Sequence, residues 1–156
     1  MARPATRKTR ALWLCRVCGR EFAKQSQWHS CRVFSIADHF RGRDPQLRVL
    51  FDSLCRALLR TGPLRVDAVQ SSINLVSRHH FAGVAVRRDH LRVGFLADHE
   101  IRSDRIGRVE RVGPHRVGHH VSVHTIKDLD AELLGWLSEA QAMQARLGRE
   151  RARSGD

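Results

Sequence analysis

The stretch Cys15-Arg-Val-Cys18-Gly-Arg-Glu-Phe22, followed by His29-Ser-Cys31, decides the fold of the N-terminal part of this 156-residue chain. A Cys-x-x-Cys turn presents two thiolates to one metal ion, and the glycine after it lets the chain reverse. A second pair of ligands then closes a tetrahedron. The spacing therefore predicts a small zinc-knuckle-like module that holds one structural zinc ion.

The predicted zinc ligands are three cysteines and one histidine, namely Cys15, Cys18, His29 and Cys31. His29 is the nearest imidazole, and a His-x-Cys pair can chelate a metal from an irregular turn, whereas residues two apart on a helix face different directions. His39 is the alternative fourth ligand if the chain folds back. A simpler interpretation treats the three thiols as buried apolar groups. Cys55 lies on the apolar face of a predicted helix, so we expect it to be a core residue.

The energetics favour a structural zinc ion. Ordering about 30 residues costs roughly 1.5 kcal/mol each. A miniature core of Trp13, Phe22, Trp28 and Phe34 is too small to offset that cost. A structural zinc site supplies on the order of 10 to 16 kcal/mol in isolated finger peptides. With four protein ligands the ion has no open position for water, so the site is predicted to be non-catalytic.

The formal net charge is +12, and only three of the 28 basic residues are lysine. This excess of arginine is typical of GC-rich bacterial coding, so the distribution of charge is more informative than its total. The first 43 residues contain ten basic and two acidic residues, and the middle of the chain is nearly balanced. The residues predicted to contact nucleic acid are Arg3, Arg7, Lys8, Arg10, Arg16, Arg20, Lys24 and Arg32.

Four segments follow from composition and hydrophobic periodicity. They are a basic disordered arm (1–10), the zinc-knuckle-like module (11–43), an α+β domain (44–145) and a charged tail (146–156). Asp44-Pro45 is a typical helix start, and leucines at helical spacing extend the helix to Thr61. A closing helix is expected from Asp128 or Asp130 to about Leu147, with an apolar stripe that includes Trp136.

Between the two helices apolar residues recur at every second position, and this alternation predicts strands. The candidate strands are residues 64–69, 73–77, 81–86, 91–96, 105–112 and 119–126. In the last of these, His119 and Val121 are assigned to the inner face, and His120 and His124 to the outer face. The predicted fold class is α+β, with an antiparallel sheet of four or five strands whose one face is covered by the N-terminal and C-terminal helices. The other face would stay open to solvent or to a partner.

Several landmarks resemble a family of bacterial proteins that carry domain of unknown function 5655. They are Trp13-Leu-Cys15-Arg-Val-Cys18-Gly-Arg-Glu-Phe22, Gln27-Trp-His29-Ser-Cys31, Asp38-His39-Phe40, Gly62-Pro63-Leu-Arg-Val66, Phe81-Ala82 and Asp128-Leu-Asp130-Ala-Glu-Leu133. The resemblance spans about residues 11 to 145 and implies a small α+β domain with a zinc knuckle and no established activity. Family members often have Ala-Tyr in the last helix, where this chain has Ala140-Gln141.

No common enzyme motif is present, because the sequence lacks phosphate-binding glycine loops, the Gly-x-Ser-x-Gly elbow and His-Glu-x-x-His. We therefore expect a non-catalytic binding module that contacts nucleic acid, single-stranded or non-specifically, through its basic N-terminal part. The alternative is a protein-interaction or small-ligand-binding domain with a purely structural zinc site, and an unrecognised enzyme is third. Whether His120 and Arg92 line a concavity is the structural observation that bears most on the enzyme question. No apolar run suggests a membrane span, and clustered thiols favour the cytoplasm.

Overall fold

The computed structural model describes residues 11–154. The chain divides into two compact units, the first ending at Val33 and the second beginning at Phe34. This division falls earlier in the chain than residue 43, where the sequence analysis placed the end of the metal module. The short helix α1 (Ile36–Phe40) consequently belongs to the second unit.

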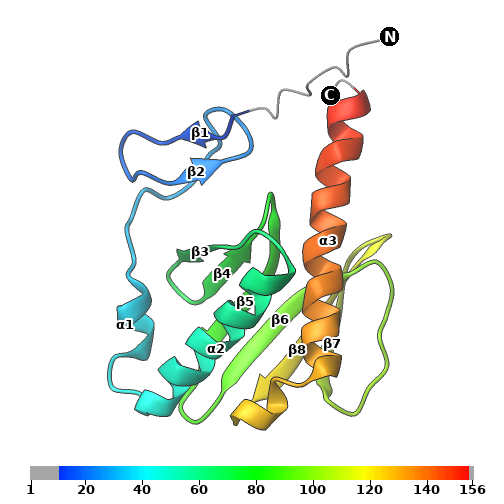
Figure 1. The fold of residues 1–156 in the computed structure, drawn as a ribbon. Coiled ribbons are helices and arrows are strands. Elements are labelled where there is room, and N and C mark those ends of the chain that lie inside the picture. Colours follow the sequence, from blue (N-terminus) through cyan, green and yellow to red (C-terminus); the bar gives the residue numbers. More distant parts are fainter. Residues whose placement is uncertain (1–10, 155–156) are drawn as a thin grey trace. The chain divides into compact units, whose positions relative to one another are not determined.

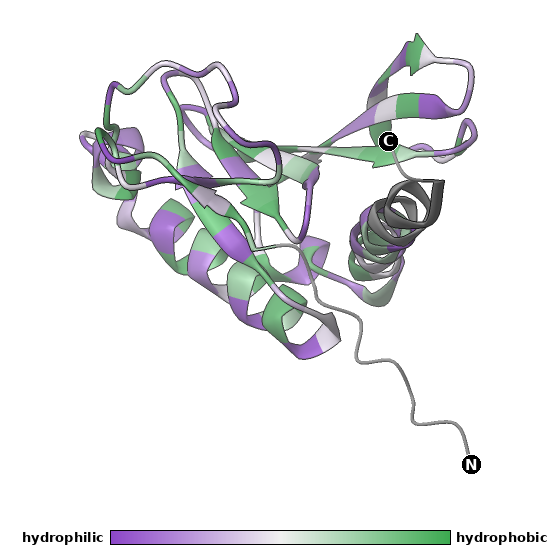
Figure 2. Ribbon diagram, turned by 90° about the horizontal axis from the view of Figure 1, so that it is seen from above, coloured by the Kyte–Doolittle hydropathy of each residue, from purple (hydrophilic) through white to green (hydrophobic). Residues whose placement is uncertain are grey.

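Helix α2 (Pro45–Thr61) begins where the sequence predicted. The carboxylate of Asp44 caps the helix by accepting a hydrogen bond of 2.9 Å from the backbone N–H of Gln46, and Pro45 occupies the first helical position. The predicted apolar stripe is buried, namely Leu47, Leu50, Phe51, Leu54 and Leu58. Hydrophobic and hydrophilic residues recur along α2 in the pattern of an amphipathic helix (Figure 2).

The second unit contains an antiparallel sheet in the order β3-β4-β5-β6-β8-β7 (Figure 1). Its strands are β3 (Arg65–Ala68), β4 (Ile73–Val76), β5 (His80–Val86), β6 (Leu91–Ala97), β7 (Ile106–Gly113) and β8 (Arg116–Val123). The α+β class is confirmed, but the predicted number of four or five strands is wrong. All six candidate segments form strands of one sheet. β8 lies between β6 and β7 and forms hydrogen bonds with both, so β7 joins the sheet as its edge strand.

Helix α3 (Ala131–Ser154) follows the short 3₁₀ helix η1 (Ile126–Asp128) and packs on β5 and β6. It continues beyond the predicted end near Leu147, because the arginines and the glutamate that follow are good helix formers. Together α2 and α3 cover one face of the sheet (Figure 1) and enclose the core with the inner-face residues of β4, β5, β6 and β8. We call the opposite face of the sheet the outer face.

The departure at Gln141 has a structural explanation. Gln141 is a buried residue of α3. Its side-chain amide nitrogen donates a hydrogen bond of 2.9 Å to the carbonyl oxygen of Pro63. Its amide oxygen accepts a hydrogen bond of 2.8 Å from the hydroxyl of Thr61. Both polar atoms of this buried amide are therefore satisfied, and the contact holds the end of α2 against α3.

Arginines recur every third residue from Arg102 to Arg111, and two of them, Arg108 and Arg111, lie in strand β7. Its pairing with β8 shifts register between Ile106 and Arg108 and again between Arg111 and Gly113. A β-bulge adds a residue to one strand, so a period-two pattern is interrupted wherever a bulge occurs. Just before the strand, Arg105 forms an ion pair of 2.6 Å with Asp130, which ties this edge of the sheet to the start of α3.

The burial of His119 makes the stability of the second unit sensitive to acid. Its ring is fully buried beside Phe95, and Nε2 accepts a hydrogen bond of 2.9 Å from the backbone N–H of Ile101. Burial lowers the pKa of His119, so the unfolded chain takes up a proton more readily than the folded one. This contribution to stability is complete above the unfolded pKa of about 6.5 and is lost as the pH falls below it.

We therefore expect His119→Gln to weaken the pH dependence of the thermal midpoint between pH 7 and pH 5. One proton taken up on unfolding corresponds to a slope of at most about 1.4 kcal/mol per pH unit. Glutamine can still accept the Ile101 hydrogen bond but does not titrate. His99→Gln is the matched control, because the side chain of His99 is 66% exposed. Equal pH dependence in both variants and the wild type would contradict this account.

Candidate metal centre

The first unit is built on a two-stranded hairpin of β1 (Trp13–Leu14) and β2 (Glu21–Phe22). Between the strands, the backbone N–H of Gly19 donates a hydrogen bond of 2.8 Å to the carbonyl oxygen of Cys15, and this bond closes the Cys-x-x-Cys turn. Gly19 has a φ of +72°, a left-handed conformation that favours glycine. The glycine after the second cysteine therefore has the role that the sequence suggested.

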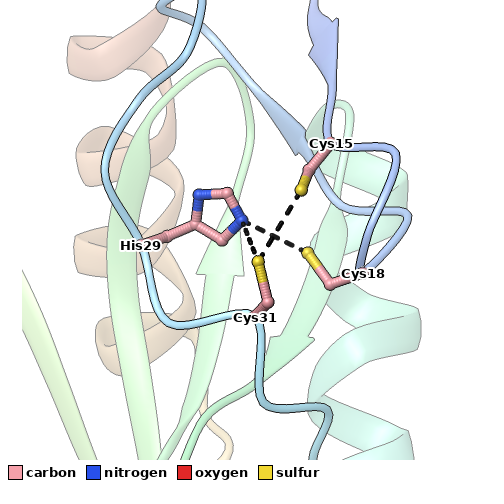
Figure 3. A group of neighbouring side chains, drawn as sticks. All are labelled: Cys15, Cys18, His29 and Cys31. Atoms are coloured by element: carbon pink, nitrogen blue, oxygen red, sulfur yellow. Dashed lines mark hydrogen bonds between the residues drawn. The ribbon is translucent and has the colours of Figure 1, made fainter.

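The turn brings two thiols together with a histidine and a cysteine from the segment after β2 (Figure 3). The Nε2 atom of His29 lies 3.3 Å from Sγ of Cys18 and 3.4 Å from Sγ of Cys31. The Sγ atoms of Cys15 and Cys31 are 3.8 Å apart, and all four cysteines of the chain are free thiols. The ligand atoms of the four residues lie within 4.8 Å of one another, so the group could hold a metal ion.

The orientation of the His29 ring is fixed by a backbone carbonyl. Nδ1 of His29 donates a hydrogen bond of 2.7 Å to the carbonyl oxygen of Gln27. A proton on Nδ1 leaves Nε2 with its lone pair facing the three sulfur atoms. This is the usual arrangement of a metal-ligating histidine, in which an outer partner sets the tautomer.

The backbone of the turn prepares two thiols to lose their protons. The backbone N–H of Arg20 is the main cause that lowers the pKa of Cys18 to about 6, and the N–H groups of Cys18 and Val17 lower the pKa of Cys15. In Cys31 desolvation and then the neighbouring Cys15 raise the thiol pKa. A cation bound among the sulfurs would offset the repulsion between the Cys15 and Cys31 thiolates and lower the pKa of Cys31. A metal-coordinated thiol is deprotonated for this reason.

Aromatic rings support the ligand group. The ring of His29 lies 4.2 Å from the Phe22 ring and 5.9 Å from the Trp13 ring, measured between centroids. Trp28, which the sequence analysis placed in this miniature core, is instead 90% exposed, and Phe34 begins the second unit. A core of two aromatic residues and one ligand ring is therefore smaller than expected.

The other predicted site residues have different positions. His39 lies in α1 of the second unit, where its Nε2 forms a hydrogen bond of 2.8 Å with the carbonyl of Val69, so it is not part of the group. Arg16, Lys24 and Arg32 are exposed on the first unit. Arg20 donates a hydrogen bond to the carbonyl of Ser30 and lies over the Phe22 ring. The predicted arm residues, Arg3, Arg7, Lys8 and Arg10, lie outside the described residues.

A second group of possible metal ligands is found where the β5–β6 turn meets the end of β8. Asp89 and His90 come from the turn and His124 follows β8, with their ligand atoms within 4.8 Å of one another. His124 was assigned to the outer face of a predicted strand, and its position beside Asp89 and His90 was not foreseen. Asp89 is 75% exposed at its side chain, so this group is far more open to water than the group around Cys15.

Together the two units define a small α+β protein with an N-terminal Cys₃His group that is compatible with a zinc-knuckle-like segment. Residues 36–145 match the family described as domain of unknown function 5655, so the chain belongs to that family. No curated protein and no solved structure gives a significant match. Across residues 11–154 the structure has no helix whose length and apolar character would suffice to cross a bilayer.

Proposed function

We propose that the first unit binds one structural zinc ion and contacts nucleic acid through its exposed tryptophan and basic side chains. The donor set supports zinc, because three thiolates and one imidazole are a common structural zinc site. Such a site has no open position for water or substrate, so the ion would stabilise the fold and supply no catalysis.

The distances within the group support a tetrahedral ion. Bonds of about 2.3 Å to sulfur and about 2.0 Å to nitrogen place two sulfurs about 3.8 Å apart and a sulfur about 3.5 Å from nitrogen in a tetrahedron. The separations of 3.8 Å between Cys15 and Cys31 and of 3.3 Å and 3.4 Å around His29 are close to these values. The four side chains would therefore need little movement to hold the ion.

The exposed ring of Trp28 is the observation that carries the nucleic-acid proposal. It directly precedes the ligand His29, and 90% of the residue is exposed, although the unit has few apolar residues to spare for its core. Single-stranded nucleic acid is bound by aromatic rings that stack on bases and by basic side chains that follow the phosphates. Arg16, Lys24 and Arg32 supply exposed positive charge on the same small unit.

The test is binding of a fluorescently labelled single-stranded oligonucleotide to the zinc-loaded full chain. We expect Trp28→Ala to weaken binding by about 1–3 kcal/mol, the usual contribution of one stacked base, whereas Trp28→Phe should retain most of the affinity. Leu59→Ala is the control, because Leu59 is an exposed apolar residue of the second unit. Equal affinity of Trp28→Ala and wild type, or no binding at low salt, would reject the proposal.

Salt dependence identifies the basic contacts. Each phosphate contact on a single strand contributes about −0.7 to the slope of log affinity against log salt concentration. Lys24→Gln should therefore make the slope shallower by about 0.7 if Lys24 meets a phosphate. If the slope is unchanged in both Lys24→Gln and Arg16→Gln, these two residues do not contact phosphates.

A protein-docking role is the second candidate. Val17 is 81% exposed and Val33 is 74% exposed, and exposed apolar side chains on so small a unit also suit a protein partner. A protein contact of this kind would depend on the valines and would be nearly insensitive to salt. The salt slope and the Trp28 variants therefore separate the two candidates.

A further inference from the structure

A concavity of about 530 Å³ lies on the outer face of the six-stranded sheet, within the second unit. This volume is within the range of small-molecule sites, which are usually about 300–1,000 Å³. The lining comes from β4, β5, β6, β7 and β8 and from the ends of these strands. His120 and Arg92, the two residues whose place in a concavity bears on the enzyme question, are both in the lining.

Glycines on three neighbouring strands form the floor. Gly83 in β5 is directly opposite Gly94 in β6, and Gly118 in β8 is opposite Leu96, the outer-face residue next along β6. None of the three glycines has a positive φ, so their backbone conformations do not require glycine. Glycine inside a strand is unfavourable and often marks a place where a ligand approaches the backbone closely.

Neighbouring side chains account for only one of these glycines. A Cβ atom on Gly94 would lie 3.1 Å from two atoms of the His120 ring, so this glycine makes room for the imidazole. A Cβ atom on Gly83 would lie no closer than 3.6 Å to any neighbour, and one on Gly118 no closer than 3.4 Å, which are ordinary contact distances. A Cβ atom would therefore fit on Gly83 and on Gly118 in ordinary contact with its neighbours, so packing within the protein does not require glycine at these two positions.

The walls of the concavity carry unpartnered polar groups. Nδ1 of His120 is buried and forms no hydrogen bond within the part of the chain that the structure describes. Burial, and then the neighbouring Arg92 and Arg108, lower the pKa of His120, so the ring is neutral near pH 7 and can donate one hydrogen bond. A buried polar atom without a partner is costly, and a bound anion that drew the His120 ring away from Gly94 would satisfy it.

The charge of the lining favours an anion. Three arginines, Arg87, Arg92 and Arg116, line the concavity against one carboxylate, that of Glu110. None of the three guanidinium groups forms an ion pair with the side chains that the structure describes, whereas Glu110 lies 3.8 Å from Arg108. Guanidinium groups bind carboxylates and phosphates through charge-assisted hydrogen bonds.

We propose that the concavity binds a small planar organic anion, with its flat body over Gly83 and Gly118 and its acidic group near Arg92 and the His120 ring. A flat molecule suits a floor of peptide planes without Cβ atoms. This site belongs to the second unit and is independent of the metal group and of nucleic-acid binding by the first unit.

The test is a titration of the ¹⁵N-labelled full chain with benzoate and with phenyl phosphate at constant ionic strength, followed by nuclear magnetic resonance. We expect saturable shifts of the Gly83, Gly94 and Gly118 amide signals. Neutral benzamide and cationic benzylamine have a similar shape and should bind at least about tenfold more weakly, because they lack the charge-assisted contacts. No saturable shift, or equal binding of all four probes, would overturn the proposal.

Two variants test the floor and the wall separately. Gly83→Val places a branched side chain on the floor, where the added Cβ atom itself meets neighbours at ordinary contact distance, and it should abolish binding of both anions. Arg92→Gln should weaken the anions about tenfold and leave benzamide unchanged. Gly135→Ala is the matched control. Gly135 is an exposed residue of α3, and a Cβ atom there would meet nothing within 4 Å. Wild-type anion binding by Arg92→Gln, or by a folded Gly83→Val chain, would refute the assignment.

Discussion

Removal of the metal should unfold the first unit and leave the second unit folded. Within residues 11–33 the rings of Trp13, Phe22 and His29 form the internal core, whereas the second unit encloses a continuous apolar core of its own. Structural zinc contributes on the order of 10–16 kcal/mol in isolated finger peptides, which is more than so few contacts can replace. The Cys18→Ser variant should therefore not bind the ion. The amide signals of residues 11–33 should lose their dispersion, as expected for an unfolded segment.

The measurement combines metal analysis of purified, reduced protein with amide spectra before and after chelation. Cys55→Ser is the matched control, because burial raises the pKa of the Cys55 thiol to about 11 and keeps it protonated in the core side of α2. We expect one zinc ion per chain in this control, as in the wild type, and none in Cys18→Ser. A metal-free chain whose first unit keeps its order would show that the thiols are packing groups only.

The local signals of the sequence predicted much of this protein. The Asp44-Pro45 start, the apolar stripe of α2 and the six strand segments are all present, because each depends on neighbouring residues in the chain. The four residues of the Cys₃His group are also brought together. A Cys-x-x-Cys-Gly turn and a nearby His-x-Cys pair restrict the chain so strongly that spacing alone suffices.

The features that the sequence did not reveal depend on pairing between distant segments. The place of His39 in the second unit depends on its contact with Val69, thirty residues away along the chain. The position of β8 between β6 and β7 places Gly118 and His120 on the same face as Gly83. Single glycines in strands are unremarkable in a sequence, and only the register shows that three of them adjoin one another.

The exposure of Trp28 illustrates a different limit. A zinc-finger template assigns this position to the core, because most small metal modules bury their aromatic residues. Here the His29 ring itself occupies the space beside Phe22, with 4.2 Å between the ring centroids. A ligand that also serves as a core residue leaves the adjacent tryptophan available for a partner.

Leu137→Ala should give the converse of metal removal, unfolding or weakening the second unit while the first unit still holds its ion. Leu137 is fully buried in α3, within the core that α3 shares with the sheet. Replacement of a buried leucine by alanine removes its apolar contacts and leaves a cavity, at a cost of about 2–5 kcal/mol. Alanine is an excellent helix former, so this loss reports core packing and not helix propensity.

Glu139→Ala is the matched control on the same helix, because Glu139 is exposed, and its effect should stay within about 0.5 kcal/mol. Chemical denaturation followed by the amide signals of each unit, with metal content measured in parallel, distinguishes the two responses. The expected result is a lower midpoint for residues 34–154 alone in Leu137→Ala. If the signals of both units shift together, the two units fold cooperatively and the division after Val33 has no thermodynamic meaning. If they separate, the two units unfold independently of each other.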